Sequence, residues 1–465
     1  MDYRNLYDGI DEQVKLPSGA FITPINFDNG ATTPPLKSVT KIIADNIQNY
    51  GPIARGVGFK GEYCTNMFDD CRKKILDFFG LSECDSHTVV YTKSDTESLN
   101  ILANTLIKNK DDMILTTRME HHANDLPFRN VGKVVYVDVD KLGRINIDDI
   151  EETLIKYKGK IKIITITGAS NVTGYINPIH EVAALAHKYN ALIIVDGAQL
   201  IAHKKVDMKG SCESESIDFF TFSAHKAYAP FGSGAIVGRK DYLNSNTPFL
   251  SGGGCVAGVF DDNIIWTGVP EKFEAGTQNF FGVIAMAKAM EDLQNIGFNN
   301  IENHESMLKN YLISNMKKIR NVILYGDTIY TDDRIGVIAF NLMEREYGDL
   351  AIKMATERGI SLRAGKFCAH PYVYRLLNVS NCDAYRDVVS GEYCYGMVRA
   401  SLGLYNTMYS LVQKDYALAV STGTDTLFKS GGIAIGILII TSFTKTYYII
   451  LKRIKLKKLE QNLEQ

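Results

Sequence analysis

Short apolar runs alternate with helical patterns between about residues 88 and 240, and this alternation most constrains the fold. The runs predicted as strands are 88–91, 113–116, 133–137, 161–167, 191–196, 217–223 and 235–238. Helical spacing of apolar residues separates several of them, at 96–107, 147–157 and 179–189. Strands that are apolar on both faces and alternate with helices are typical of a parallel sheet covered on both sides. We therefore predict an α/β fold with a mostly parallel, seven-stranded sheet.

The pattern changes after about residue 285. Two helices, a strand, a further helix and a last strand are predicted at 284–296, 303–319, 336–341, 350–357 and 395–400. This order indicates a smaller α+β unit. The predicted division is an N-terminal segment (1–24), a large domain (25–284), a small α+β domain (285–412) and a tail (413–465).

Charge and cysteine usage exclude some classes of function. The chain has 51 Lys+Arg and 53 Asp+Glu, a net charge of -2, so it has no basic excess for nucleic acid. Its 8 cysteines show no CxxC pair and no zinc spacing, so we expect no metal site. Residues 1–10 are polar and acidic, unlike a signal peptide. We expect a cytoplasmic protein with free thiols.

The ends of the predicted strands carry polar residues, and ligands of such sheets bind beyond the carboxyl ends of the strands. Asp196 ends one strand, and Lys226 follows the next. Taken alone, Asp196 is more often a turn cap and Lys226 a surface cation. Together they offer an amine for a Schiff base and a carboxylate for a pyridinium nitrogen, which are the groups that pyridoxal phosphate needs from a protein.

Other strand ends add to this set. Thr96 begins a helix after strand 88–91 and could hold a phosphate, although a plain helix cap is the alternative. His121, which follows strand 113–116, could lie over an aromatic cofactor, whereas a lone histidine is more often only packed. Asn171 follows strand 161–167 and could reach a phenolic oxygen or a substrate carboxylate. Five such groups at one edge favour a cofactor site.

Ten motifs extend this pattern along the chain. They are FDNGATTPP (27–35), ARG (54–56), DTESLN (95–100), MEHHAN (119–124), SNVTG (170–174), VDGAQ (195–199), FSAHKAYAPFGSGA (222–235), FEAGTQN (273–279), RAGKFCAHP (363–371) and VRASLGLYNT (398–407). With them the chain resembles the class V branch of fold-type-I pyridoxal-phosphate enzymes, and within it the cysteine desulfurase/selenocysteine lyase group. The motifs run in family order from about residue 20 to residue 410.

The resemblance implies the fold-type-I transferase fold, pyridoxal 5'-phosphate as cofactor, and roles for matching residues. For the cofactor it implies the Schiff-base Lys226, Asp196 at the ring nitrogen, a catalytic His121 stacked on the ring, Gln199 at the phenolic oxygen, and Thr96, Ser223 and His225 at the phosphate. Thr277 would reach the phosphate of the other subunit, which implies a homodimer. The substrate carboxylate would bind Arg399 and Asn171, with Arg363 nearby.

Cys368 distinguishes between activities within the group. Similar desulfurases carry a cysteine in an RxGxxCA loop, which here is RAGKFCA (363–369). Lys366, Arg363 and His370 would give it positive surroundings that favour the thiolate nucleophile; a packed small residue is the alternative. The implied reaction converts L-cysteine to L-alanine and leaves a persulfide on Cys368, for transfer to an unidentified acceptor protein or thiol, as in iron-sulfur cluster assembly.

Two alternatives to this reaction stay open. One is selenocysteine lyase or another class V lyase or aminotransferase reaction. The other is a non-catalytic, membrane-tethered sulfur-relay scaffold, against which the joint presence of Lys226, Asp196 and Cys368 argues.

Three departures from the family pattern bear on substrate and acceptor. The usual Gly-Thr-Thr before the phosphate helix is Ser94-Asp95-Thr96, and Asp95 would repel a phosphate unless it points away. Gly58 replaces a usual histidine. Lys366 and Phe367 replace frequent histidines before Cys368.

The tail contains an apolar segment, residues 431–451, with Lys445 as its single charge. This length is enough to cross a bilayer. The basic residues after it would keep the C-terminus in the cytosol and move the catalytic domain outside, which conflicts with a cytosolic enzyme. We expect a C-terminal anchor or interfacial helix with the enzyme facing the cytosol; a buried helix of the small domain is the alternative.

Overall fold

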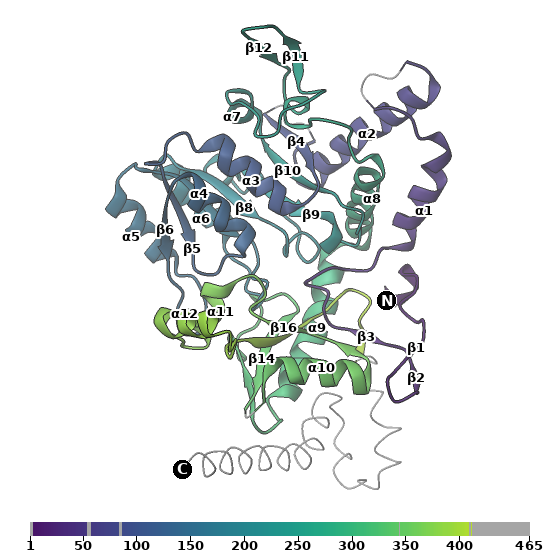
Figure 1. Cartoon of the computed structure of the whole chain (residues 1–465), viewed down its shortest axis with the longest axis vertical. Coiled ribbons are helices and arrows are strands. Elements are labelled where there is room, and N and C mark those ends of the chain that lie inside the picture. The colour runs from purple at the N-terminus through teal and green to yellow at the C-terminus, as the bar shows by residue number, and fades with distance from the viewer. Residues whose placement is uncertain (1–2, 54–56, 83–85, 344, 409–410, 412–465) are drawn as a thin grey trace, which may run out of the picture.

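A computed structural model describes residues 3–53, 57–82, 86–343, 345–408 and 411. Its centre is a seven-stranded sheet, with a smaller unit of strands and helices beside it (Figure 1). In spatial order the strands are β4 (His87–Thr92), β10 (Gly234–Arg239), β9 (Phe219–Ser223), β8 (Leu192–Asp196), β7 (Ile161–Thr167), β5 (Met113–Thr117) and β6 (Lys133–Val137). All neighbours are parallel except the two pairs that contain β10. The predicted mostly parallel sheet of seven strands is confirmed.

Helices cover both faces of this sheet because successive strand residues point to opposite sides. On β8, Ile193 and Val195 pack into the core formed with α2 (Phe59–Phe78), α6 (Ile179–Lys188) and α8 (Phe280–Ile296). Ile194 points the other way, into the core formed with α3 (Asp95–Leu106) and α4 (Leu126–Val131). The continuous apolar runs in the sequence reflect this burial on both faces.

The remaining elements of the large part are short or lie at its periphery. They are η1 (Tyr3–Leu6), β1 (Val14–Lys15), β2 (Phe21–Ile22), α1 (Lys37–Asn46), η2 (Ile47–Asn49), η3 (His122–Asn124), α5 (Ile147–Tyr157), η4 (Glu213–Glu215), η5 (Ala224–Lys226), α7 (Lys240–Asn244), β11 (Val256–Val259), β12 (Ile264–Trp266) and η6 (Glu271–Phe273). The β11–β12 hairpin projects at the end of the molecule away from the small unit (Figure 1).

The smaller C-terminal region is built on a four-stranded sheet in the order β13, β14, β17, β16. Its elements are α9 (Phe298–Met316), β13 (Val322–Leu324), β14 (Val337–Leu342), α10 (Tyr347–Arg358), β15 (Ile360–Ser361), β16 (Arg363–Gly365), α11 (His370–Leu376), α12 (Asn381–Ser390) and β17 (Met397–Ser401). The N-terminal strand β3 (Ile25–Asn26) pairs with β15, and Phe27 packs into the core of this region. The N-terminal segment therefore contacts both units, since Tyr3 and Tyr7 pack into the core of the large one. The predicted domain boundaries remain predictions.

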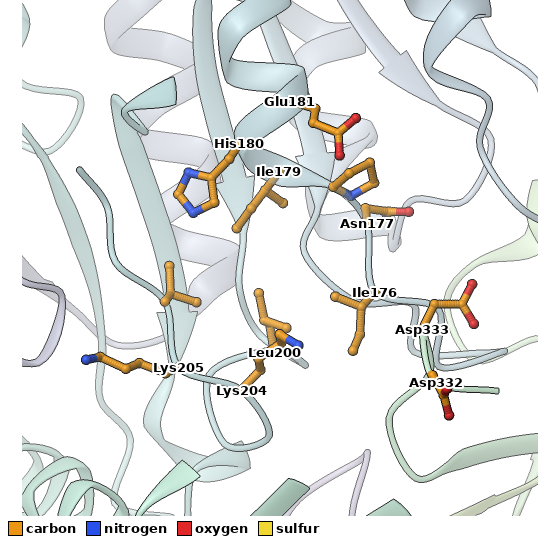
Figure 2. Close-up of a pocket in the computed structure, with 12 residues that line it drawn as sticks. Ile176, Asn177, Ile179, His180, Glu181, Leu200, Lys204, Lys205, Asp332 and Asp333 are labelled. Carbon is orange, nitrogen blue, oxygen red and sulfur yellow. The ribbon is translucent and has the colours of Figure 1, made fainter. Parts of the chain in front are cut away.

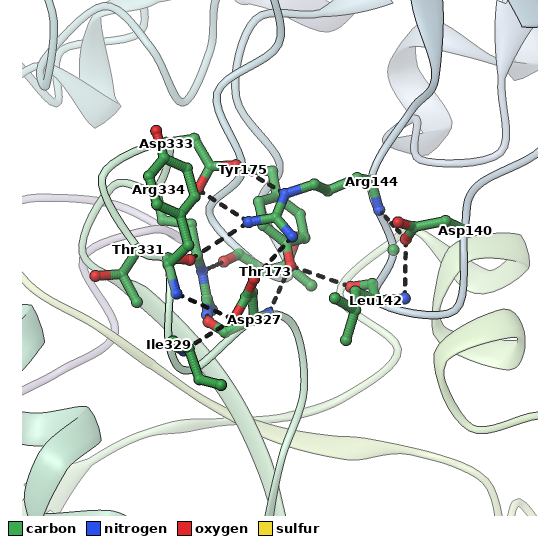
Figure 3. Close-up of polar contacts among 12 residues, drawn as sticks. Asp140, Leu142, Arg144, Thr173, Tyr175, Asp327, Ile329, Thr331, Asp333 and Arg334 are labelled. Atoms are coloured by element: carbon green, nitrogen blue, oxygen red, sulfur yellow. Dashed lines mark hydrogen bonds and ion pairs between the residues drawn. The ribbon is translucent and has the colours of Figure 1, made fainter.

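An arginine cluster joins the two units (Figure 3). Arg144, in the loop before α5, contacts Asp327 at 3.0 Å and Asp333 at 2.9 Å, both in the segment between β13 and β14. Arg334 of the same segment donates to the carbonyl oxygen of Thr173 at 2.7 Å. We call Arg144, Thr173, Asp327, Asp333 and Arg334 the interdomain latch. It fixes the small unit against the ends of β6 and β7.

Within the described ranges, no helix has the length and apolar character needed to cross a membrane. The predicted tail segment 431–451 lies outside the described residues, as does the ARG motif. Every cysteine in the described part of the chain is a free thiol.

Candidate active site

The carboxyl ends of β5, β7, β8 and β9 open onto one cavity of about 330 Å³. Eleven of the twelve predicted site residues line this cavity, together with Asp95, Phe367 and others: Thr96, His121, Asn171, Asp196, Gln199, Ser223, His225, Lys226, Arg363, Arg399 and the predicted nucleophile Cys368. Thr277 does not; it is exposed at a separate hollow beside Lys93 and Glu97. The predicted contact of Thr277 with the phosphate of a second subunit therefore stays a prediction.

Asp196 and Lys226 are a buried carboxyl and a buried amine in the wall of this cavity. Asp196 ends β8, is 2% exposed, and accepts the N–H of Ala198 at 2.9 Å. Lys226 ends the single turn η5, directly after β9. Burial lowers the pKa of Lys226, while the carboxylates of Asp196 and Asp95 oppose that shift. Burial thus favours the neutral amine, the form that acts as a nucleophile or base.

The histidines at the cavity are neutral. Burial, reinforced by Lys226, lowers the pKa of His121 to about 3. Its Nδ1 accepts the N–H of Ala123 at 3.1 Å, so the ring proton belongs on Nε2. Burial and Lys226 likewise lower the pKa of His225 to about 4. A neutral His121 ring can stack on an aromatic cofactor without adding charge.

At the phosphate end of the site, Ser94 rather than Thr96 caps helix α3, because the Ser94 hydroxyl accepts the N–H of Glu97 at 3.3 Å. Asp95 donates its N–H to Ser223 at 2.7 Å, and its side chain is buried facing Asp196. The carboxyl of Asp95 is therefore directed at Asp196, and the Thr96 hydroxyl is not used as the helix cap.

The loop that carries Cys368 is held from the large unit. The N–H of His122 donates to the Cys368 carbonyl oxygen at 2.7 Å, and the Asn171 amide donates to the Phe367 carbonyl oxygen at 2.7 Å. Phe367 and Cys368 both have left-handed backbone angles, with φ of 52° and 54°. Such angles are unfavourable for side chains with a Cβ, so contacts from outside the loop must maintain them. The exposed thiol is thereby presented to the cavity.

The three groups expected to give Cys368 positive surroundings are each paired with a carboxylate or neutral. Lys366 is buried against Asp387, 3.8 Å away, between the rings of Tyr374 and Tyr393. Arg363 pairs with Asp28 at 2.7 Å. Burial lowers the pKa of His370 to about 4, so this ring is neutral.

Lys226 and Arg399 interact electrostatically with Cys368. Both lie far from Cys368 in sequence, on the turn after β9 and on β17. The fold therefore brings cations to Cys368 that its neighbours in sequence did not indicate.

Arg399 is the buried cation of the substrate side. It lies on β17, is 3% exposed, and donates to the Asn171 carbonyl oxygen at 2.8 Å and to Asp28 at 3.1 Å. Its Nε has no hydrogen-bond partner among the described residues. Arg363 lies opposite Arg399 in the β16–β17 pair and shares Asp28. The two guanidinium groups and one carboxylate leave a net positive charge, which suits a substrate carboxylate.

Two functional neighbours were not assigned from the sequence. Asp28 lies within the quoted FDNG motif, but its pairing with Arg363 and Arg399 depends on contacts more than 300 residues apart. Glu120 precedes His121 and accepts from Thr117 and Asn124, each at 2.6 Å. Burial raises the pKa of Glu120 to about 8. In the sequence, the signal for each residue was its place within a quoted motif, FDNGATTPP for Asp28 and MEHHAN for Glu120.

A second cavity, of about 370 Å³, lies between the start of α6 and the segment before β14 (Figure 2). His180, Glu181, Lys204, Lys205 and Asp333 are its charged or titratable residues, together with Asp332. It shares no residue with the first cavity and contains none of the predicted site residues. The chemistry is concentrated in the first cavity.

The residues of the first cavity fit pyridoxal phosphate. The site offers the Lys226 amine, whose pKa is lowered by burial, the carboxyl group of Asp196, and the uncharged imidazole of His121. Thr96, in the first turn of α3, and the Ser223 hydroxyl line the cavity and offer donors for a phosphate. This donor set matches the aldehyde, the ring nitrogen, the ring face and the phosphate of that cofactor.

Comparison with known proteins supports the same assignment. The chain matches the family described as Aminotransferase class-V over residues 25–412. It is 31% identical over 417 residues to a probable cysteine desulfurase of Halalkalibacterium halodurans, covering 87% of this chain and 94% of the relative. It is 32% identical over 359 residues to a cysteine desulfurase of Haloferax volcanii, covering 75% and 82%.

Solved structures agree in fold. The apo structure of a cysteine desulfurase from Thermococcus onnurineus superposes with a TM-score of 0.74 at 28% identity, covering 86% of this chain and 94% of that one. The cysteine desulfurase CsdA from Escherichia coli gives 0.71 at 26% identity, covering 85% and 94%. The chain belongs to the class-V aminotransferase family and, within it, to the cysteine desulfurases.

Proposed function

We propose that this protein is a pyridoxal-phosphate-dependent cysteine desulfurase that converts L-cysteine to L-alanine and takes the sulfur as a persulfide on Cys368. The carrying observation is that Lys226, Asp196, Arg399 and Cys368 line one cavity of about 330 Å³. Each contributes a chemically different group, and a protein that only binds has no need of all four.

Bound pyridoxal phosphate would supply the electron sink for cleavage at the substrate's α-carbon. Lys226 would hold the cofactor and move the proton at Cα, a role that the lowering of its pKa by burial favours. Asp196 would fix the ring nitrogen, and the first turn of α3 with Ser223 would hold the phosphate. His121 would cover the ring.

Arg399 would bind the substrate carboxylate. Its guanidinium is oriented by Asp28 and by the Asn171 carbonyl oxygen, and its Nε, without a partner among the described residues, adds a donor. The charge-assisted contact would place the substrate sulfur toward the loop that carries Cys368.

Sulfur transfer would occur at Cys368. The thiolate attacks the substrate sulfur, a sulfur–sulfur bond forms, and the carbon–sulfur bond breaks with its electron pair passing to the substrate carbon. After protonation of that carbon the products are L-alanine and one persulfide. The persulfide then passes to a thiol or an acceptor protein, which the cavity alone does not identify.

We extend the proposal to the protein's setting. Free thiols and thiolate chemistry suit a cytoplasmic enzyme. The exposed position of Thr277 suits a homodimer in which it contacts the partner's phosphate. Selenocysteine lyase is the second candidate, because Lys366 and Phe367 stand at positions where the family often has histidines.

Alanine formation from L-cysteine by the purified, cofactor-loaded protein tests the proposal. Cys368→Ser should stop alanine release, and mass spectrometry should find one extra sulfur on the wild-type peptide containing Cys368. Cys382→Ser, at another exposed thiol, is the matched control and should retain activity. Alanine formation that survives Cys368→Ser would reject the persulfide route, and exclusive turnover of selenocysteine would favour the second candidate.

A further inference from the structure

Asp95, the residue at which this chain departs from its family motif, lies in the wall of the active cavity. It is the first residue of α3, and its N–H donates to Ser223 at 2.7 Å. Its side chain is 5% exposed, and its carboxyl interacts with the equally buried carboxyl of Asp196. Two carboxyl groups can hydrogen-bond only when one carries a proton, because an ionised carboxylate has no donor.

Asp95 is the better carrier of that proton. Asp196 already accepts the N–H of Ala198, which favours its ionised form. The Oδ1 atom of Asp95 has no hydrogen-bond partner among the described residues. Burial, and then the charge of Asp196, raise the pKa of Asp95 well above its usual range, although the Thr221 hydroxyl and Lys226 oppose the shift. An uncharged Asp95 also avoids repelling a phosphate at the start of α3.

The other titratable groups around the pair have defined states. Lys226 interacts electrostatically with both carboxyls, which oppose the lowering of its pKa by burial. Glu120 lies on the segment after β5. Burial raises its pKa to about 8, and the charge of Asp196 adds to this shift. His121 lies on the same segment and is neutral, because its pKa is about 3. Arg399 interacts electrostatically with Lys226.

We propose that Asp95 is a positioning residue that stays protonated and donates a hydrogen bond to Asp196. The pair then presents one shared negative charge to the cofactor ring. The inference rests on the proposed function, because it places pyridoxal phosphate in this cavity. The bond fixes the orientation of Asp196 and weakens the charge with which it stabilises a protonated ring nitrogen.

The test compares wild type, Asp95→Asn and Asp95→Ala, each loaded with pyridoxal phosphate and titrated by absorbance between about pH 6 and pH 10. Asparagine keeps the shape and a neutral donor, so its spectral midpoint should match that of wild type. Alanine removes the donor and leaves Asp196 with its full charge. Its midpoint should rise by about one pH unit, a tenfold effect of the size of one hydrogen bond to a charged group. Asp148→Asn, in the exposed first turn of α5, is the control and should not shift.

Stability of the cofactor-free protein gives a second readout. A carboxyl whose pKa is raised by folding stabilises the protein at low pH, and this contribution is lost as pH rises through the folded pKa. Asp95→Asn cannot ionise. Wild type should therefore lose melting temperature relative to Asp95→Asn as pH rises.

The opposite patterns overturn the inference. If Asp95 is ionised, Asp95→Asn and Asp95→Ala both remove a negative charge, and both midpoints fall together. If Asp95 is uncoupled from Asp196, no midpoint moves. Failure of wild type to bind pyridoxal phosphate, or to retain a borohydride-reduced label on Lys226, rejects the proposed function itself and is distinguishable from either result.

Discussion

The interdomain latch and the active cavity both gather charged side chains where the two units meet, but they satisfy those charges differently. In the latch, Arg144 lies between Asp327 and Asp333, and hydrogen bonds from the backbone N–H of Ile329, together with Arg144, lower the pKa of Asp327 (Figure 3). In the cavity, burial raises the pKa of the carboxyls and lowers that of Lys226.

The difference shows what each charge cluster is for. Matched pairs hold two parts of a protein together without further partners. Buried groups with displaced pKa values and unused hydrogen-bonding atoms are typical of sites that wait for a ligand. The Nε of Arg399 and the Oδ1 of Asp95 are such atoms within the described residues. Substitutions in the active cavity should therefore change activity. Substitutions in the interdomain latch should change stability.

The largest expected effect follows from removing the amine of the cavity. Lys226→Ala should lower turnover of L-cysteine by at least about 10³-fold, because both the cofactor link and the proton transfer at Cα are lost. Alanine release and the absorbance of bound cofactor measure it. Lys204→Ala, in the second cavity, is the matched control and should keep full activity. A borohydride-stable label on another lysine would contradict the assignment.

The positions of the strands and the site could be predicted well, whereas the pairing of charges could not. The strand that ends in Asp196 and the strand before Lys226 were found because their apolar runs are continuous and buried on both faces. Their meeting at one edge follows from parallel topology. Lys366 was assigned to Cys368 because the two are close in sequence, yet it pairs with Asp387 on α12. Such choices depend on tertiary contacts that a linear pattern does not contain.

A smaller effect should come from the substrate side of the cavity. Arg399→Lys keeps the charge but loses the fork that contacts Asp28 and the Asn171 carbonyl oxygen. The KM for L-cysteine should rise about tenfold, with a smaller change in kcat. Arg363→Lys changes the half-exposed member of the same pair and should have less effect. A larger KM change in Arg363→Lys would make Arg363 the main carboxylate ligand.

Glu120, buried behind the active cavity beside His121, tests whether a displaced pKa affects stability. Folding raises its pKa from 4.5 to about 8, so its stabilising contribution is present at low pH and is lost as pH rises through about 8. Glu120→Gln cannot ionise. Relative to wild type, the variant should therefore gain about 3 kcal/mol of unfolding free energy between pH 5.5 and pH 9. Urea unfolding at the two pH values measures this, and an equal difference at both would show that Glu120 does not titrate in this range.

The smallest expected effect comes from the latch, and it should appear in stability rather than in chemistry. Arg144→Leu leaves Asp327 and Asp333 without their shared guanidinium, although Ile329 and Tyr330 still donate their backbone N–H groups to Asp327. With Arg144 about a quarter exposed, solvent weakens the pairing, so we expect a loss of about 1 kcal/mol in unfolding free energy. KM and kcat at low temperature should match wild type, because neither carboxylate lines the active cavity. Arg320→Leu, at an exposed arginine outside the latch, is the control for removing a surface charge. A fall in kcat without a loss of stability would show that the latch positions the loop of Cys368, and the division between the two charge clusters would then fail.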